Sequence, residues 1–205
     1  MSIPEKKEVI FKAVLSLLRQ GKEIADLHIS EIAQEAGIGK GTVYEYFSSR
    51  EELLLEMLLY HREKEYQAIR TGLLCTGSFD ERLTVLEDRL LLFVQRGDSG
   101  CSLFSQRAVP QSLFQRIWES PEMQSQNCER LDEFCGYLTE AAVAEGLIAK
   151  EPDKAYGRMV FLGCFMAFAG ISRGQSEERR LSKIRADLRR MLLSALSGES
   201  IPPIL

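Results

Sequence analysis

Histidine and paired cysteines, on which many catalytic and metal sites depend, are scarce in this sequence of 205 residues. The two histidines, His28 and His61, have no nucleophile–base arrangement and no metal-ligand spacing near them. The five cysteines are odd in number and form no C-x-x-C pair, which argues against a disulfide framework and a zinc site. We therefore expect no enzyme activity, no cofactor and no metal. Cys128 and Cys135, two turns apart on one helix face, are expected to be small packed side chains, with redox sensing as the alternative.

A surplus of positive charge and a long apolar run are missing as well. The chain has 26 Lys and Arg against 30 Asp and Glu, a net charge of −4, and residues 1–50 hold seven of each sign. The strongly basic patch typical of nucleic-acid-binding proteins is therefore absent at the level of composition. No run of about 18 apolar residues predicts a membrane-spanning helix, and the sequence after Met1 lacks a signal-peptide apolar region. We expect a cytoplasmic protein without a membrane partner.

Helix signals dominate what is present. Apolar residues recur at spacings of three and four, and no period-two pattern competes, so the predicted fold class is all-α with about nine helices. With 45% hydrophobic residues, the chain can bury a substantial core. Outside residues 30–54, helices are predicted over residues 9–18, 53–70, 79–95, 121–146, 153–170 and 177–196.

Residues 30–54 carry most of the functional information. Ser30 is the expected N-cap of a helix that Gly37 ends, because glycine adopts the left-handed C-cap conformation without steric strain. A short second helix is predicted over residues 40–47, with Val43 and Phe47 facing inward under a polar and aromatic outer face. This order is typical of a helix-turn-helix whose second helix enters the DNA major groove.

The start of the next helix adds a second signal. Ser49 and Glu52 predict an S-x-x-E capping box, and the free N–H groups of such a helix start attract phosphate, to which Arg50 adds a positive charge. The same pattern also occurs in helical hairpins that do not bind nucleic acid. The zero net charge of residues 1–50 does not decide between the two interpretations.

The run Ile-Ala-Gln-Glu-Ala-Gly-Ile-Gly-Lys-Gly-Thr-Val-Tyr-Glu-Tyr-Phe-Ser-Ser-Arg-Glu-Glu-Leu resembles the signature of the tetracycline-repressor (TetR) family of one-component regulators. The resemblance implies a helix-turn-helix DNA-binding domain over residues 1–48 and an effector-binding and dimerisation domain over residues 49–205. His28 and Ser30 stand where the family often has Thr and a basic residue. The resemblance implies DNA contacts from Ser30, Lys40, Gly41, Thr42, Tyr44, Tyr46 and Arg50.

The apolar helix predicted over residues 153–170 is the second informative region. It is apolar all round and rich in small residues, so it packs on its own core with one face and on something else with the other. An internal core helix is the alternative, but the resemblance favours a two-fold dimer built as a four-helix bundle with the last helix. The predicted interface residues are Gly163, Ala167, Gly170, Leu181, Ile184, Leu188 and Met191.

Aromatic residues are numerous in the middle of the chain. Such a stripe is more often plain core, but the resemblance implies an effector pocket among these helices, which would suit a small, largely apolar ligand. The candidate pocket residues are Phe93, Phe104, Trp118, Phe134, Tyr137, Phe161 and Phe165.

These observations together predict a homodimeric, ligand-responsive transcription regulator that binds a palindromic operator in double-stranded DNA. The resemblance makes it a repressor that a small effector releases. The alternative is a helical ligand-binding or interaction protein whose head does not bind DNA. The effector, the operator and the regulated genes do not follow from the sequence.

Overall fold

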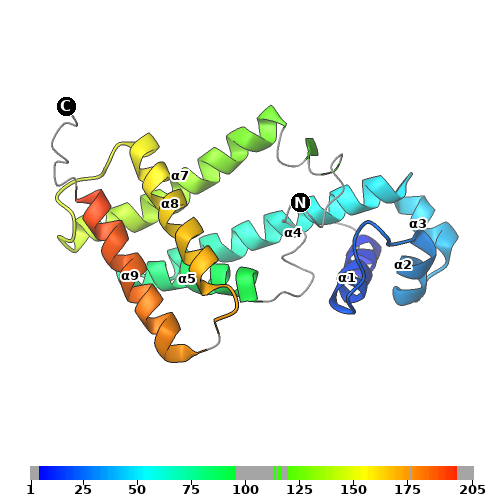
Figure 1. Cartoon of the computed structure of the whole chain (residues 1–205). Helices are drawn as coiled ribbons and strands as arrows, with labels where there is room; N and C mark the ends of the chain where they lie inside the picture. Colours follow the sequence, from blue (N-terminus) through cyan, green and yellow to red (C-terminus); the bar gives the residue numbers. More distant parts are fainter. Residues whose placement is uncertain (1–4, 96–112, 114, 117–119, 176, 198–205) are drawn as a thin grey trace. The chain divides into compact units, whose positions relative to one another are not determined.

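The computed structural model describes residues 5–95, 113, 115–116, 120–175 and 177–197 (Figure 1). Within these ranges the structure is helical and has no strand, which confirms the all-α prediction. The helices are α1 (Glu5–Arg19), α2 (Ile29–Glu35), α3 (Lys40–Tyr46), α4 (Arg50–Leu74), α5 (Phe79–Gln95), α7 (Pro121–Ala144), α8 (Lys154–Ser172) and α9 (Glu178–Leu196).

The chain divides into two compact units. Unit 1 comprises residues 1–65 and 96–124, and unit 2 comprises residues 66–95 and 125–205. Helix α4 therefore contributes its first part to unit 1 and its last part to unit 2. The predicted domain boundary after residue 48 lies just before α4 and stays a prediction.

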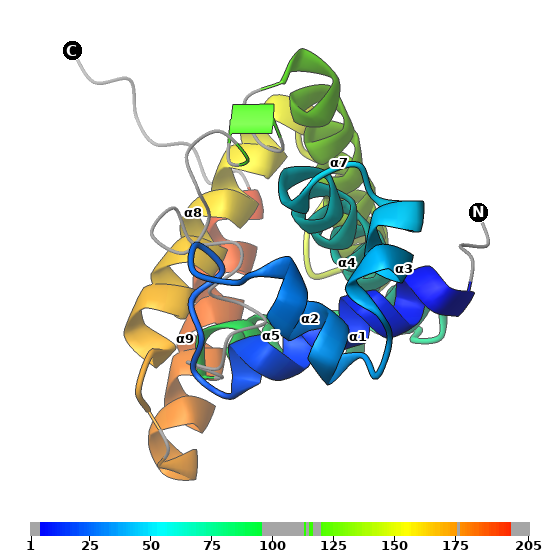
Figure 2. The ribbon, with the colours of Figure 1, turned by 90° about the vertical axis from the view of Figure 1, so that its right-hand side faces the viewer.

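The core of unit 1 forms where α1, α2, α3 and the first half of α4 meet (Figure 2). Phe11 lies at its centre, with ring centroids 5.8 Å from Phe47 and 5.3 Å from Tyr60. The sequence analysis placed Val9 on the buried face of α1 and left out Phe11. Val9 is exposed and Phe11 is buried, because the buried stripe of α1 starts at Ile10.

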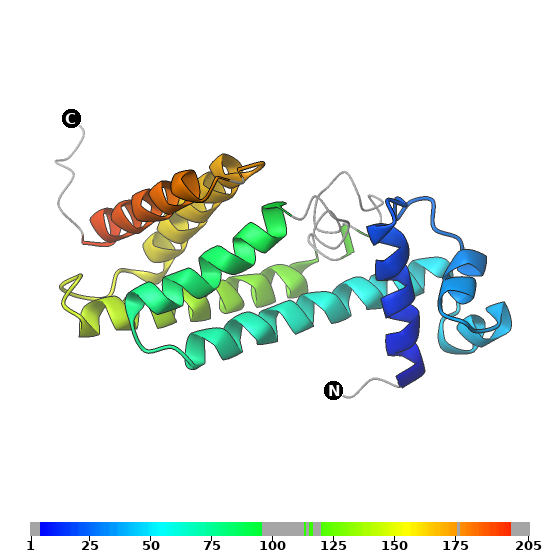
Figure 3. The same ribbon diagram turned by 90° about the horizontal axis from the view of Figure 1, so that it is seen from below.

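Unit 2 holds α5, α7, α8, α9 and the end of α4. Helices α8 and α9 lie side by side (Figures 1 and 3). Asp153 caps α8: its Oδ1 accepts hydrogen bonds from the N–H groups of Ala155 (2.9 Å) and Tyr156 (3.1 Å). One face of α8 packs into the core of unit 2 through Gly157, Phe161, Cys164, Phe168 and Ser172.

Helix α8 also corrects an expectation. By length and composition it could cross a membrane, although no such segment was predicted. The sequence argument required an uninterrupted apolar run, whereas α8 meets the test with Lys154 and Arg158 in its first turns. A core helix of a soluble protein passes the same test, and α8 packs one face into a core.

Candidate nucleic-acid interface

The turn between α2 and α3 is a Schellman motif. Gly37 has φ +67° and donates its N–H to the carbonyl of Gln34 at 3.1 Å. The N–H of Ile38 donates to the carbonyl of Ala33 at 3.0 Å. These two bonds satisfy carbonyl groups at the end of α2 and turn the chain into α3, which confirms that Gly37 ends the helix.

Helix α3 has a buried face and an open face. Val43 and the C-cap residue Phe47 are buried in the core of unit 1, as predicted from their spacing. Lys40, Gly41 and Tyr44 are exposed on the other side.

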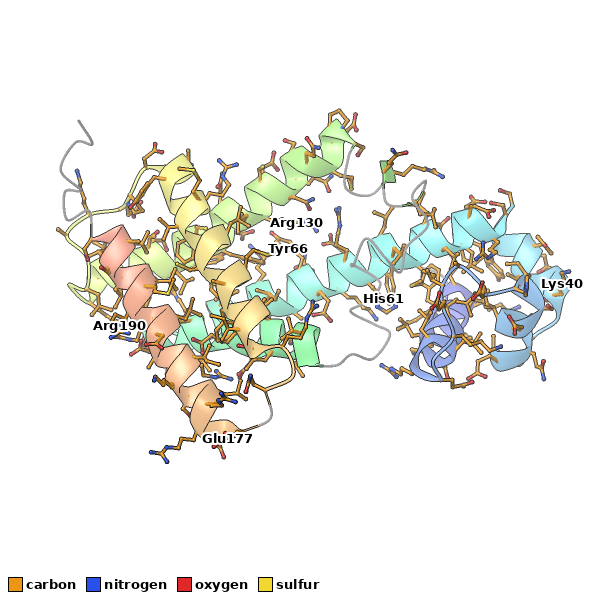
Figure 4. All side chains as sticks on the ribbon, viewed as in Figure 1. Lys40, His61, Tyr66, Arg130, Glu177 and Arg190 are labelled. Carbon is orange, nitrogen blue, oxygen red and sulfur yellow. The ribbon has the colours of Figure 1, made fainter. Side chains whose placement is uncertain are left out.

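The open face of α3 carries one positive charge and an aromatic ring. The Nζ of Lys40 lies over the ring of Tyr44, 5.9 Å from its centroid, and Figure 4 shows Lys40 at the outer edge of unit 1. Glu45 is also exposed, whereas Thr42 and Tyr46 are half-buried, and Tyr46 packs against the core. The structure thus places the predicted α3 residues on or beside one solvent-facing surface.

The start of α2 differs from the prediction. The N-cap is His28, not Ser30, and α2 begins at Ile29 because that side chain is buried. Glu31 accepts a hydrogen bond from the N–H of His28 at 3.0 Å, and it also pairs with Lys22. The bonds from Lys22 and His28 hold the pKa of the Glu31 carboxyl below its usual value. Ser30 lies exposed in the first turn of α2.

The capping box at the start of α4 is displaced by one residue. Ser49 Oγ accepts a hydrogen bond from the N–H of Glu52 at 3.1 Å, as predicted. The Glu52 carboxylate, however, returns to Ser48, whose N–H donates to Oε2 at 2.6 Å and whose hydroxyl donates to the same oxygen. The bonds from Ser48 lower the pKa of Glu52. The extra residue lets the chain leave Phe47 in an extended conformation.

Arg50 faces the protein's own backbone. Its Nε donates to the carbonyl of Leu27 at 2.5 Å, and its Nη2 donates to the carbonyls of Ile24 (2.7 Å) and Ala25 (2.5 Å). Its Nη1 lies 3.5 Å from a carboxylate oxygen of Glu51. The sequence signal at Arg50 was its charge, and these partners lie too far away in the chain to be read from a local motif.

Several lysines of unit 1 are paired with carboxylates. Lys7 lies 2.6 Å from Glu56, and Lys64 lies 3.0 Å from Glu8. Lys40, in contrast, contacts an aromatic ring. Its charge therefore stands on the outer face of α3 without a carboxylate in its described contact.

The predicted dimer residues divide into two groups. Gly163, Gly170 and Met191 are exposed, and Ala167, Leu181 and Ile184 are half-buried. Leu188 is a correction: it is 2% exposed and belongs to the core of unit 2. The open face of α8 carries large apolar side chains that the sequence analysis did not select, namely Tyr156, Met159, Leu162, Met166 and Ile171. Their spacing of three and four along α8 was the available signal.

The aromatic candidates for an effector pocket have different surroundings. Phe161 is buried in the core and stacks on Phe165, with ring centroids 6.1 Å apart. Phe134 stacks on Tyr66 at 5.5 Å, and the hydroxyl of Tyr137 donates to Glu133 at 2.9 Å. The side chain of Phe93, and all of Phe104 and Trp118, lie outside the described residues.

Glu133 gathers a polar cluster that sequence reasoning missed. Its carboxylate accepts hydrogen bonds from Tyr66, from Tyr137 and from the Nε of Arg70 at 2.8 Å. Burial raises the pKa of Glu133, but these three bonds together hold it below its usual value. Arg130 lies over the ring of Tyr66, 4.2 Å from its centroid (Figure 4). Helices α4 and α7 are joined here by charge-assisted bonds.

The cysteines do not form a common site. Cys75 and Cys128 are exposed, and Cys135 and Cys164 are buried. Burial raises the pKa of the Cys135 thiol to about 12 and raises that of Cys164 as well. A thiol that stays protonated reacts slowly, so the two buried cysteines suit packing better than redox sensing.

Residues 21–57 match the sequence model described as "Bacterial regulatory proteins, tetR family". The uncharacterised HTH-type transcriptional regulator YuxN of Bacillus subtilis is 36% identical to this chain over 91 residues. That match covers 42% of this chain and 31% of the relative, so the chain spans less than a third of that protein's length.

Solved structures share the fold over nearly the whole chain. A putative transcriptional regulator of the TetR family from Vibrio parahaemolyticus has a TM-score of 0.64 and 22% identity, covering 91% of this chain and 98% of that chain. The transcriptional regulator FadR from Bacillus subtilis, in complex with stearoyl-CoA, has a TM-score of 0.61 and 18% identity, covering 94% and 99%. At these identities the similarity shows the fold.

Proposed function

The chain belongs to the TetR family of bacterial regulatory proteins, and on this premise we propose that it is a homodimeric, ligand-responsive DNA-binding transcription regulator. The observation that carries the proposal is the open face of α3, held on a buried Val43 and Phe47 by the Schellman turn. A helix presented in this way can enter the major groove.

The proposed DNA contacts are on α3 and at the start of α2. Lys40 and Tyr44 are exposed and can reach phosphates or base edges, and Gly41 lets the helix backbone come close to the DNA. Thr42, Tyr46 and Ser30 complete the proposed surface. The partner is double-stranded DNA with an inverted repeat, because two such helices related by a two-fold axis read two half-sites.

Selection from random-sequence duplex DNA tests this function. We expect the wild-type protein to enrich an inverted repeat, and the double variant Lys40→Ala/Tyr44→Ala to enrich none. Lys150→Ala is the matched control, since it removes an exposed lysine from unit 2. If the double variant enriched the same repeat as the wild type, the proposed contact surface would be wrong.

The open apolar face of α8 supports the homodimer. An exposed patch of large apolar side chains is typical of an interaction site, and Met159 and Met166 are 65% and 70% exposed. Gly163 and Gly170 lie on the same face and allow two helices to approach closely. The proposed interface is therefore α8 of each protomer, with α9 beside it.

The proposed effector is a small, largely apolar molecule that releases the protein from its operator, as in a repressor. The aromatic side chains of Phe134, Phe161 and Phe165 in unit 2 support this ligand class, as does the similarity to a regulator bound to stearoyl-CoA. The effector shifts the balance between two states only through its differential affinity for them, typically about 1–3 kcal/mol.

A second candidate is a helical ligand-binding or interaction protein in the same fold. The zero net charge of residues 1–50 and the paired lysines of unit 1 favour it. A wild-type selection that returned no inverted repeat would support this candidate. Both candidates are non-enzymes, and both are proposed to be cytoplasmic.

A further inference from the structure

Arg50 joins the two ends of the helix-turn-helix. Its guanidinium holds the carbonyls of Ile24, Ala25 and Leu27, which belong to the connection between α1 and α2. These partners lie 23 to 26 residues before Arg50, so the bonds bridge from the chain that enters α2 to the chain that leaves α3. The Arg50 side chain is 24% exposed.

The three carbonyls need such a donor. No backbone N–H among the described residues donates to the oxygens of Ile24, Ala25 or Leu27. The side chains of Ile24 and Leu27 are buried, which draws this stretch of backbone against the core of unit 1. Carbonyl groups left without a partner in such a place destabilise the fold by about 1–3 kcal/mol each. A guanidinium suits the site because its N–H groups form a rigid planar fork, which an ammonium group lacks.

The same bonds leave little of Arg50 for DNA. The Nε–H and both Nη2 hydrogens are directed at the three carbonyls. The remaining Nη1 group lies beside the Glu51 carboxylate at 3.5 Å. A phosphate that approached Nη1 would meet this negative charge, and the attraction would be reduced.

We infer that Arg50 is a positioning residue, which fixes the start of α2 on the start of α4, and not a phosphate contact; the inference rests on the proposed DNA-binding function. The connection that Arg50 holds runs directly into His28, the N-cap of α2. Arg50 is itself the first residue of α4. A displacement of the α4 start is therefore passed to α2 through hydrogen bonds, and from α2 to α3 through the Schellman turn.

Two substitutions separate positioning from phosphate contact. Arg50→Lys keeps the positive charge but cannot bind three carbonyls, and Arg50→Ala removes both. The probe is the duplex that the wild-type protein enriches from random-sequence DNA, titrated by fluorescence anisotropy over a series of salt concentrations. We expect both variants to bind about tenfold or more weakly, with the same dependence of log K on log salt as the wild type.

A phosphate contact gives the opposite pattern. Arg50→Lys would then keep nearly full affinity, and the salt dependence of Arg50→Ala would become shallower by about 0.9. That result would overturn the inference. Lys40→Ala is the control, because a loss of charge on the open face of α3 should reduce both affinity and salt dependence.

Hydrogen exchange tests the inference without DNA. In both Arg50 variants of the full chain we expect the amides of residues 24–32 to exchange faster, while those of residues 161–168 in unit 2 stay unchanged. Wild-type protection of residues 24–32 in Arg50→Lys would overturn the inference, and this variant decides if Arg50→Ala does not fold. If the wild type enriched no duplex, the proposed function would fail, and hydrogen exchange would still decide whether Arg50 holds the connection.

Discussion

Gly37 and Gly41 lie one helical turn apart in sequence but are glycine for different reasons. Gly37 has φ +67°, a conformation that other residues adopt only with strain. Gly41 lies inside α3 with helical backbone, and a Cβ added there would meet no atom within 4 Å. The folded protein therefore does not require glycine at position 41, whereas close approach of α3 to DNA would.

Gly41→Ala should separate stability from DNA binding. Alanine is the better helix former, so we expect the free energy of unfolding to rise by about 0.5–1 kcal/mol. We expect affinity for the enriched duplex to fall at least tenfold, because the methyl group would hold the helix away from the DNA. Urea unfolding and anisotropy titration measure the two effects.

Gly37→Ala is the matched control for this substitution. Its positive φ predicts a loss of stability of about 1 kcal/mol. A Gly41→Ala variant with wild-type affinity would show that DNA does not approach α3 at this position.

At the scale of residues, the sequence predicted what local chemistry determines. Gly37, Val43 and Phe47 were correctly assigned because a turn conformation and a helical spacing depend on neighbours a few residues away. Arg50 was assigned from its charge alone, since its carbonyl partners lie more than twenty residues away. Ser30 was taken as an N-cap, but burial of Ile29 and the Glu31 bond to His28 start the helix earlier.

At the scale of elements, α5 and α9 are joined by a row of ion pairs. Arg185 lies 2.8 Å from Glu87 and 2.5 Å from Asp88, and Arg189 lies 2.5 Å from Asp80. Glu87 is the buried member of the row, with a side chain 4% exposed. Burial raises the pKa of its carboxyl, and Arg185 lowers it by less.

The raised pKa gives Glu87 a defined effect on stability. A carboxyl whose pKa rises on folding binds more protons in the folded state, so above that pKa its charge destabilises the fold. This destabilisation fades as the pH falls through the folded pKa towards the ordinary value of 4.5. We therefore expect Glu87→Gln to be as stable as the wild type or more stable at neutral pH, with the difference shrinking as the pH is lowered.

Arg185→Met should have the opposite consequence. It leaves Glu87 buried without its cation, and we expect a loss of about 2–4 kcal/mol at neutral pH that is smaller in the Glu87→Gln background. Arg190→Met is the control, since its exposed pair with Asp187 should contribute less than about 0.5 kcal/mol. Urea unfolding of the four-member cycle checks this. A Glu87→Gln variant clearly less stable than the wild type at neutral pH would contradict the argument.

Helix positions were more predictable from sequence than helix surroundings. The bounds of α5, α7 and α9 agree with the predicted ranges to within a few residues, because apolar spacing and the capping residues mark them. The loop predicted from Leu73 begins later, since Leu73 is buried and extends α4 to Leu74. Leu188 and Met191 share the apolar side of α9, and only packing decides that one is core and the other exposed.

At the scale of the whole molecule, an acidic chain must bind DNA without a general excess of positive charge. The net charge is −4, and several lysines of unit 1 are paired with carboxylates. Affinity then depends on fit at two half-sites more than on counterion release. Binding at both half-sites together requires that the two heads belong to one dimer, so the open face of α8 is as important for DNA binding as α3.

Met166→Glu tests this dependence. Met166 is 70% exposed at the open face of α8, so the substitution should leave the fold of the protomer intact while placing a charge in the proposed interface. We expect a monomer by light scattering, a wild-type helical spectrum by circular dichroism, and affinity for the enriched duplex reduced about 100-fold, because linkage of two heads is lost. Leu74→Glu is the control, an exposed apolar residue at the end of α4, and should remain a dimer with wild-type affinity. A Met166→Glu protein that stayed dimeric would place the interface elsewhere, and a monomer with full affinity would show that one head suffices.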